Sequence, residues 1–388
     1  MYNILTLNSI SKVIDNVFDK NYKVKTDVEK PIGIMLRSFK MHDYELDANT
    51  VAIARAGAGT NNIPVEKYAE QGVVVFNTPG ANANAVKELV LTSLFLGSRK
   101  ITDAIDWVKT LKGQGDEIGK LVEKGKSNFA GCEIMGKKLG VIGLGAIGAL
   151  VANSAIDLGM QVYGYDPFLS VNNALKLSSQ IKIVKELEDI AKKCDYITIH
   201  IPYIADQNKG IMNKKLFSKM KNGTVLINCA RGELVNNDDV IDAVKSGKLA
   251  RYIVDFPSEE LIGVENIINI PHLGASTEEA EDNCAIMAAK QLIDYIENGN
   301  IVNSVNYPNC TMQRSTSFRL VVLHKNIANI LAQITTAVAK ENINISNLTN
   351  QSRGAYAVTI LDVDNEVSEQ AISHINAVDG IIKVRVIK

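Results

Sequence analysis

The chain reads KLGVIGLGAIG from Lys138 to Gly148, an apolar run that leads into three glycines spaced Gly-x-Gly-x-x-Gly. Gly143 permits a tight turn, Gly145 lets the backbone approach a pyrophosphate, and Gly148 lets a helix pack closely on the strand. Asp166 ends the next apolar run, 18 residues after Gly148. A carboxylate there binds a ribose diol and repels a 2′-phosphate. The stretch therefore predicts a dinucleotide site that prefers NAD to NADP.

Apolar runs alternate with amphipathic segments throughout the middle of the chain. Strands are expected over 138–145, 161–166, 196–202, 224–230, 251–256 and 266–272, and helices over 146–159, 185–193, 213–220 and 236–247. Strands that alternate with helices in this way form a parallel sheet covered on both faces. We therefore expect an α/β domain over 91–274 with a doubly wound, Rossmann-type parallel sheet.

The two flanks differ from this middle part. Residues 1–90 alternate more weakly, in PIGIMLRS, TVAIARAG and GVVVFNTPG, and predict a smaller flavodoxin-like α/β unit. A helical pattern over 277–299 returns the chain to that unit, so a discontinuous substrate domain of 1–90 and 275–305 is expected. After a polar linker, residues 314–388 follow a βαββαβ order, which predicts a ferredoxin-like sandwich.

Composition limits the classes of partner. The net charge of −1 has no basic tract behind it, which argues against nucleic acid as a partner. The five cysteines form no C-x-x-C pair, so neither a zinc site nor a disulfide framework is indicated, and a reducing compartment fits best. The longest apolar run, at 89–97, is shorter than the roughly 20 residues that span a bilayer. No signal peptide is evident, and a cytoplasmic protein is expected.

Polar groups follow three of the predicted strands. Arg231 lies in NCARGELV, Glu259 in DFPSEE and His272 in IPHLGAST. The carboxyl ends of parallel strands meet at one edge of a sheet, where ligands bind. Hydride transfer from a 2-hydroxy acid needs a proton acceptor, a carboxylate to orient it, and a cation for the substrate carboxylate. Taken singly, each residue fits a surface charge or a structural role equally well, and the glycine turn could be purely structural.

Together, GLGAIG, GYDP, NCARGELV, FPSEE and PHLGAST resemble the signature series of the D-isomer-specific 2-hydroxyacid dehydrogenases, in the family's order and over nearly the whole chain. The resemblance implies that Arg231 binds the substrate carboxylate, that Glu259 supports the histidine, and that His272 is the acid/base. It also implies further cofactor contacts from Ile147, Cys229 and Asp255. The family usually writes Leu-Asp-Val-Phe-x-x-Glu-Pro, whereas this chain lacks one residue between Asp255 and Glu259, which puts the cofactor role of Asp255 in doubt.

Two arginines bear on the choice of substrate. Arg37, followed by Ser38, and Arg55 end predicted strands of the first domain, and arginine suits phosphate through its fork of donors. Similar positions bind substrate in the family, together with loop residues that match Asn77 and Asn82. The resemblance implies NAD-dependent oxidation of D-3-phosphoglycerate to 3-phosphohydroxypyruvate, which begins L-serine biosynthesis. Another D-2-hydroxy acid, or a non-catalytic sensor of NAD and amino acids, are the alternatives.

The C-terminal βαββαβ segment resembles an ACT domain, a module that binds amino acids between paired copies. The resemblance implies that L-serine is held by His324, Asn326 and Asn344. The first loop of the module usually carries Arg-Pro-Gly, whereas this chain has Ile-Ala-Asn at 327–329. A module that only dimerises is the alternative. Both the family and the module imply a homo-oligomer, and no metal is expected.

Overall fold

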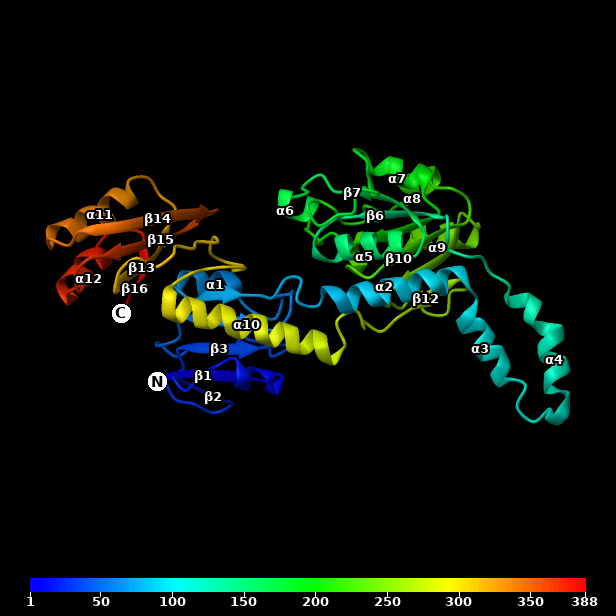
Figure 1. Cartoon of the computed structure of the whole chain (residues 1–388), viewed down its shortest axis with the longest axis horizontal. Helices are drawn as coiled ribbons and strands as arrows, with labels where there is room; N and C mark the ends of the chain where they lie inside the picture. The colour runs from blue at the N-terminus through cyan, green and yellow to red at the C-terminus, as the bar shows by residue number, and fades with distance from the viewer. The chain divides into compact units, whose positions relative to one another are not determined.

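A computed structural model describes all 388 residues (Figure 1). The chain forms two compact units, which we describe separately. Unit 1 comprises Met1–Ala81 and Glu281–Lys388, and unit 2 comprises Asn82–Ala280. The boundary expected near residue 90 falls inside helix α2 (Ala83–Ser98), so that helix belongs wholly to unit 2.

Unit 2 is built on a seven-stranded sheet in the order β12-β11-β10-β9-β6-β7-β8, in which every pair of neighbours is parallel. The strands are β6 (Lys138–Ile142), β7 (Gln161–Tyr165), β8 (Lys182–Ile183), β9 (Tyr196–Ile199), β10 (Thr224–Asn228), β11 (Leu249–Val254) and β12 (Ile267–Asn269). The chain order reverses between β6 and β9, which is where ligands bind in open parallel sheets. The predicted doubly wound sheet is confirmed.

Helices cover both faces of this sheet. The apolar side chains of α2 and α5 (Ala146–Asp157) pack on one face in a single core. Those of α7 (Leu187–Lys193), α8 (Lys214–Lys219) and α9 (Asn237–Lys245) pack on the other. The central strands β9 and β10 are buried along their whole length, because both faces are covered.

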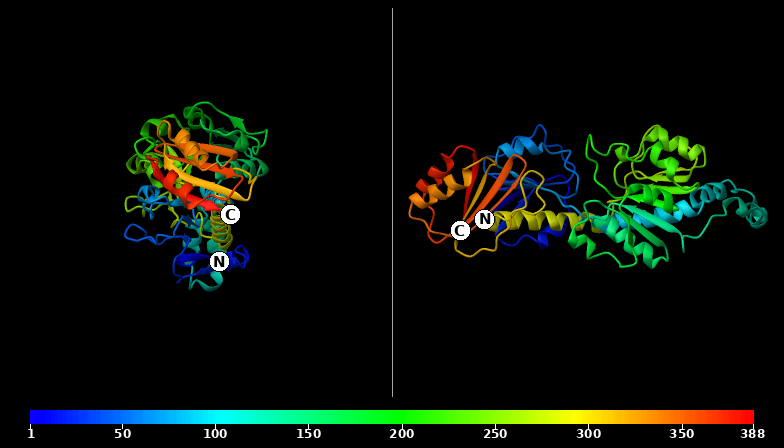
Figure 2. Two further views of the ribbon diagram at one scale, coloured as in Figure 1. Left: turned by 90° about the vertical axis from the view of Figure 1, so that its left-hand side faces the viewer. Right: turned by 90° about the horizontal axis from the view of Figure 1, so that it is seen from above.

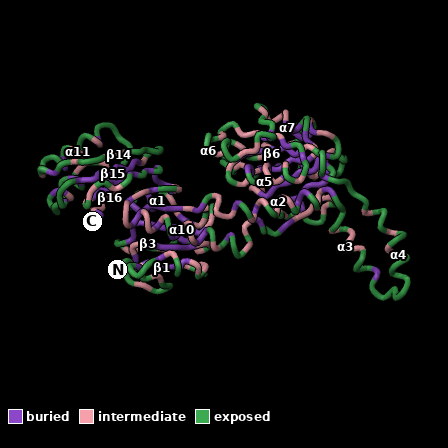
Figure 3. Tube along the Cα trace, viewed as in Figure 1, coloured by how far each residue is buried: buried purple, intermediate pink, exposed green.

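A helical arm between α2 and β6 was not expected from the sequence. It consists of α3 (Ile101–Lys109), η2 (Gly115–Glu117), α4 (Ile118–Gly125) and η3 (Lys126–Phe129). Neither α3 nor α4 has a buried residue, and Figure 3 shows most of this segment in the exposed and intermediate colours; Leu111, between the two helices, is buried.

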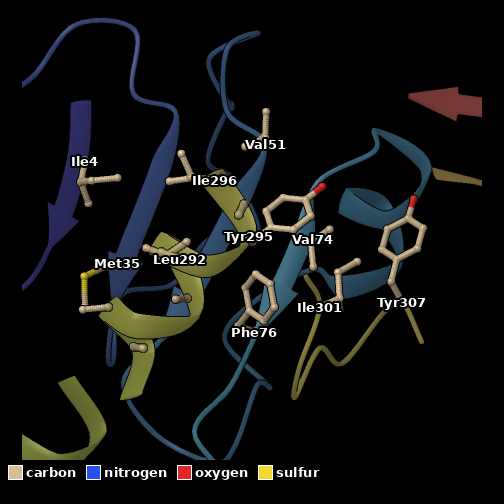
Figure 4. Close-up of a cluster of buried hydrophobic side chains, with 14 of the residues drawn as sticks. Ile4, Met35, Val51, Val74, Phe76, Leu292, Tyr295, Ile296, Ile301 and Tyr307 are labelled. Atoms are coloured by element: carbon tan, nitrogen blue, oxygen red, sulfur yellow. The ribbon is translucent and has the colours of Figure 1, made fainter. Parts of the chain in front are cut away.

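Unit 1 contains a parallel sheet in the order β2-β1-β3-β4-β5. The strands are β1 (Tyr2–Leu7), β2 (Tyr22–Lys25), β3 (Gly33–Leu36), β4 (Ala52–Arg55) and β5 (Val74–Phe76), with helix α1 (Val65–Glu70) before β5. The long helix α10 (Glu278–Asn298) packs on this sheet. Figure 4 shows Leu292, Tyr295 and Ile296 of α10 among the buried side chains of the strands.

The C-terminal part of unit 1 is a four-stranded antiparallel sheet in the order β14-β15-β13-β16. Its elements are β13 (Phe318–Lys325), α11 (Ile330–Lys340), β14 (Ile345–Arg353), β15 (Tyr356–Val363), α12 (Glu369–Asn376) and β16 (Ile381–Ile387). This βαββαβ order and strand arrangement are those of a ferredoxin-like sandwich. Helices α11 and α12 cover one face of this sheet (Figure 2). Side chains of the other face join the core that contains α10. No helix of the protein combines the length and the apolar character needed to cross a bilayer.

Candidate active site

The three polar groups predicted from the sequence follow three neighbouring strands of unit 2. Arg231 comes after β10, Glu259 after β11 and His272 after β12. Because β10, β11 and β12 are parallel neighbours, all three groups leave the carboxyl edge of the sheet. The glycine turn follows β6 at the same edge. The structure therefore assembles at one edge the groups that the strand pattern predicted.

His272 lies in an unusual turn. Its backbone adopts the left-handed conformation, with φ of +55°, which costs a residue with a side chain about 1–2 kcal/mol. The side chain is exposed, and the ring of Phe256 lies 4.7 Å from the imidazole centroid. The amide of His272 donates to the carbonyl of Ile270 at 3.0 Å. The imidazole is thus presented at the surface by a turn that needs support from its neighbours.

The Asp255 carboxylate accepts hydrogen bonds from the two residues that follow His272. Its Oδ1 accepts a hydrogen bond from the amide of Leu273 at 2.7 Å, and its Oδ2 accepts one from Gly274 at 2.8 Å. The side chain is almost completely buried, and burial raises the pKa of Asp255, opposed by these two hydrogen bonds and by the field of His272. Each oxygen of this carboxylate, whose cofactor role the sequence put in doubt, thus accepts a backbone amide of the turn after His272.

Arg231 is exposed, and its Nη1 donates only to the neighbouring carbonyl of Ala230, at 2.7 Å. The turn that carries it is fixed by Asn228, a fully buried residue at the end of β10. The Asn228 amide donates to the carbonyl of Arg231 at 2.8 Å and accepts from the amide of Ala230 at 3.1 Å. Sequence reasoning missed Asn228, although a polar residue in the apolar run TVLIN was a signal of such a role.

Glu259 is exposed, and no ion pair joins it to His272. Its neighbour Glu260 is held differently, since a hydrogen bond from Ser258 lowers the pKa of the Glu260 carboxyl. The structure thus brings Glu259 to the same edge as His272 without a direct contact between them.

The glycine turn has the features of a phosphate cradle. Gly143 has φ of +89°, and a Cβ there would lie 2.6 Å from the carbonyl oxygen of His200. A Cβ on Gly148 would lie 1.9 Å from the oxygen of Gly143, whereas nothing lies within 4 Å of a Cβ placed on Gly145. Gly145 also begins α5 without any side chain to cap it. The first amides of α5, including that of Ile147, therefore remain available to an anion.

Asp166 stabilises this turn from the end of β7. Its Oδ2 accepts from the amide of Leu144 at 2.9 Å, and its Oδ1 accepts from Phe168 at 2.9 Å. The side chain is half-exposed, so its remaining lone pairs face away from the core. The turn, the open space at Gly145 and this carboxylate together fit a dinucleotide.

The partly exposed His200, which follows β9, and the buried Cys229, which follows β10, lie at the same edge. Burial lowers the pKa of His200 to about 3, so the imidazole is neutral, and its Nδ1 has no hydrogen-bond partner while Nε2 contacts Thr198 at 3.0 Å. Burial raises the pKa of Cys229 to about 12, opposed by a hydrogen bond from Ser93. Cys229 therefore stays a protonated thiol and cannot act as a nucleophile. His200 was missed from the sequence.

In unit 1, the residues expected to bind substrate follow three neighbouring strands. Arg37 and Ser38 follow β3, Arg55 ends β4, and Asn77 follows β5. Arg37 forms an ion pair with Glu281 at the start of the unit 1 part of α10. The side chain of Asn77 donates to the carbonyl of Ala58 at 2.6 Å.

One further residue ties these strand ends together. Asn62 accepts from Nε of Arg55 at 3.1 Å and donates to the carbonyls of Arg37 and Phe39 at 3.2 and 2.7 Å. The sequence analysis did not identify it. Asn82 lies in unit 2, where it precedes α2 and makes no side-chain capping bond.

The residues expected to bind an effector occupy different parts of the C-terminal sheet. His324 is buried with both ring nitrogens bonded, to the carbonyl of Lys325 and the hydroxyl of Thr359, each at 2.9 Å. Asn326 follows His324 on the same strand end, whereas Asn344 contacts Asp364 near the opposite end of β15. Within one chain, roughly 20 Å of strand separates the two places, at about 3.3 Å per residue.

The first loop of this module also differs from expectation. Asn329, which stands where the module usually has glycine, adopts a left-handed conformation with φ of +66° and begins α11. Asparagine tolerates this conformation better than most residues with a side chain.

In the whole chain, no three His, Cys, Asp or Glu side chains are grouped so that they could hold a metal ion.

Comparison with known proteins adds to this geometry. Residues 91–274 match the family model described as D-isomer specific 2-hydroxyacid dehydrogenase, NAD binding domain. The chain is 32% identical over 349 residues to D-3-phosphoglycerate dehydrogenase of Haemophilus influenzae, with 87% of this chain and 81% of the relative covered. It is 32% identical over 370 residues to that of Escherichia coli, with 92% and 86% covered.

A solved structure of a 3-phosphoglycerate dehydrogenase with bound NAD⁺, from Entamoeba histolytica, is similar with a TM-score of 0.59 and 26% identity. The similarity covers 79% of this chain and 98% of that one. The likeness therefore extends beyond the seven-stranded sheet.

Proposed function

Because the chain belongs to the D-isomer specific 2-hydroxyacid dehydrogenase family and is an NAD-dependent dehydrogenase, we propose that it oxidises D-3-phosphoglycerate to 3-phosphohydroxypyruvate, the first step of L-serine biosynthesis. The observation that carries the proposal is the placement of Arg231, Glu259 and His272 at the same sheet edge as the glycine turn. The names and coverage of the relatives support the choice of substrate.

The chain's own residues have distinct parts in this reaction. The amides at the start of α5 and Asp166 would hold NAD, which would supply the hydride acceptor for C2 of the substrate. The exposed guanidinium of Arg231 pairs with the substrate carboxylate, for which its fork of donors is suited. The His272 imidazole takes the proton of the C2 hydroxyl in oxidation and returns it in reduction. Glu259 lies at the same edge and is proposed to support the histidine.

The cofactor residues follow from the turn that they form. We assign the pyrophosphate to the amides at the start of α5, which the three glycines leave open, and the adenosine ribose to Asp166. Ile147 and Cys229 border the same space. Since the family model that matches is an NAD-binding domain, the cofactor itself is not in question.

Unit 1 supplies the groups that fit a phosphorylated substrate. Arg37 and Arg55 stand at adjacent strand ends and share Asn62 as a support. Two guanidinium groups suit a dianionic phosphate better than an uncharged substrate tail. Ser38, Asn77 and Asn82 are proposed as further hydrogen-bonding partners of the substrate.

The first experiment measures NADH consumption with 3-phosphohydroxypyruvate, for the parent protein and for His272→Ala. We expect turnover in the parent and a loss of at least about 100-fold in the variant, the usual size of a general acid/base contribution. Unchanged turnover in His272→Ala would remove the histidine from the mechanism. No turnover in a parent protein that still binds NADH would refute this substrate and direct the search to other 2-keto acids.

We also propose that the C-terminal sandwich is an ACT domain that binds L-serine between two copies of the chain. The separation of Asn344 from Asn326 within one chain is consistent with a ligand site completed by a second copy, whereas His324 is buried with both ring nitrogens already bonded. L-serine titrations of activity and of binding test this, and an absence of any effect on both would leave a module that only dimerises.

A homo-oligomer is supported by the helical arm of unit 2. Ile101, Ile105 and Val108 lie on one face of α3 at helical spacing, and each is 41–52% exposed. We propose that a second copy of the chain covers this stripe.

The five free cysteines support a reducing, cytoplasmic location.

A further inference from the structure

We propose that Asp255 is a positioning residue for His272, and that its carboxylate holds the turn that presents the imidazole instead of binding the cofactor. This inference rests on the proposed role of His272 in proton transfer. It concerns a role that the sequence pattern assigned differently, and it follows from how the Asp255 carboxylate is used in this fold.

The first argument is that both carboxylate oxygens of Asp255 are aimed at the turn after His272, and that unlike the half-exposed Asp166 the side chain has almost no surface left for a ligand. Oδ1 accepts from Leu273 at 2.7 Å and Oδ2 from Gly274 at 2.8 Å, in a side chain that is 1% exposed. The backbone of Asp255 is fixed as well, since its amide donates to the carbonyl of Asn228 at 3.0 Å. Asp255 therefore links the fixed end of β11 to the two residues that directly follow His272.

The second argument is that His272 needs such a link. A left-handed backbone at a residue with a side chain persists only where the surroundings impose it. Two consecutive amides aimed at one carboxylate fix the direction in which the chain leaves His272. The adjacent residue, Phe256, packs its ring 4.7 Å from the imidazole centroid. Asp255 thus holds the backbone after His272, and Phe256 contacts the ring.

The third argument concerns the sequence of this strand end. The family pattern separates the aspartate from the phenylalanine by one residue, whereas Asp255 and Phe256 are consecutive here. Asp255 and Phe256 form a bend directly after β11 ends at Val254. In this bend Asp255 is buried, whereas Phe256 is partly exposed and lies beside the exposed ring of His272.

The decisive variant is Asp255→Asn, assayed with NADH and 3-phosphohydroxypyruvate. The amide keeps one acceptor but places its NH₂ group against a backbone amide, so one of the two hydrogen bonds is lost. We expect kcat to fall at least about tenfold, because misplaced catalytic groups lose rate steeply. The NADH dissociation constant, measured by fluorescence, stays within about threefold of the parent, since one lost contact to a cofactor would change it about tenfold or more.

A second variant tests the same contact from the other side. A methyl group on Gly274 would lie 3.0 Å from Oδ2 of Asp255. Gly274→Ala therefore disturbs the turn with the carboxylate intact, and we expect a smaller loss of kcat in the same direction. This variant also covers the case in which Asp255→Asn fails to fold.

Asp195→Asn is the matched control. Asp195 accepts a backbone hydrogen bond from Lys138 at 2.9 Å in the same sheet, but at the start of β6, away from the carboxyl edge. We expect this variant to lower thermal stability and to leave kcat unchanged.

The double variant Asp255→Asn/His272→Ala separates positioning from an independent role. If Asp255 acts through His272, the double variant is no slower than His272→Ala alone. A further tenfold loss would overturn the inference. It would also be overturned if Asp255→Asn weakened NADH binding tenfold and left kcat unchanged at saturating NADH. Unchanged turnover in His272→Ala would instead refute the proposed function of the histidine, which is a separate outcome.

Discussion

Arg319 of the C-terminal sheet and Arg231 of unit 2 differ in burial and in hydrogen-bond partners. Arg319 is 0% exposed and binds Asp362 through two hydrogen bonds, of 2.6 and 3.0 Å. Its Nη1 donates to the carbonyls of Asn298 and Met312. Arg231 is exposed and has no carboxylate partner. A charge whose bonds all lie inside the protein maintains the fold, whereas a charge left open at a strand end is available to a ligand.

The two histidines differ in the same way. His324 is buried with both nitrogens bonded, and burial lowers its pKa although hydrogen bonds with the Lys325 carbonyl and the Asn350 side chain oppose the shift. His272 is exposed in a left-handed turn. From the sequence and its resemblances, His272 was expected to be the acid/base and His324 to bind an effector. Hydrogen-bond satisfaction distinguishes them, and it is visible only in three dimensions.

The largest effect is expected from Arg319→Met, which leaves the Asp362 carboxylate buried without its cation. Breaking a buried ion pair from one side costs about 3–5 kcal/mol. In calorimetry, the transition of unit 1 should therefore move down by on the order of 10 °C.

Arg319→Met/Asp362→Leu is the control for that prediction, because it removes both charges at similar volume. Such replacements are often neutral or stabilising, so the double variant should regain much of the loss. If the single and double variants melted together, the cost would come from packing and from the carbonyls of Asn298 and Met312, not from the unpaired charge.

Arg231→Met is expected to show the opposite behaviour. Removing a charge-assisted contact to the substrate carboxylate should lower kcat/KM about 10- to 100-fold. The melting temperature should stay near that of the parent, because Arg231 is exposed and bonds only to its neighbour. A large loss of stability would show that Arg231 belongs with Arg319 as a structural charge.

The alternation of apolar strands and helices made unit 2 predictable. The helix expected over 146–159 ends two residues earlier, at Asp157, and the strands agree closely with β6, β7, β9, β10 and β11. Buried parallel strands read as continuous apolar runs, and glycine spacing marks the turn. The helical arm was not predicted, although Ile101, Ile105 and Val108 recur at helical spacing in α3; the helices α3 and α4 bury no residue in unit 2.

The sequence predicted the edge of the sheet at which the candidate site lies, but not the hydrogen bonds that hold its residues. Strand order placed Arg231, Glu259 and His272 together, since parallel strands end at one edge. The supports Asn228 and Asn62 were missed, because each acts through hydrogen bonds to backbone groups brought near by the fold. Periodicity records which residues are buried, and it does not record which backbone amides a side chain meets.

The smallest effect is expected on the free energy of unfolding when the pH is lowered. Burial by itself would raise the pKa of the Asp362 carboxyl, but hydrogen bonds from Arg319 and Ser315 outweigh burial and hold that pKa below its usual value. In the unfolded chain an aspartate titrates near about 3.9. The folded state thus gains stability from the ionised Asp362 above that pH, and the gain is lost as pH falls through the folded pKa.

Urea unfolding of unit 1 at a series of pH values below about 5 measures this loss. The parent should lose more unfolding free energy over that range than Arg319→Met/Asp362→Leu, which has no carboxyl at position 362 to titrate. Parallel curves for the two proteins would show that the buried pair does not contribute to acid sensitivity. The charges of Arg319 and Asp362 would then add no pH-dependent stability. Arg319 and Arg231 would differ in how far they are buried and not in what their charge contributes to stability.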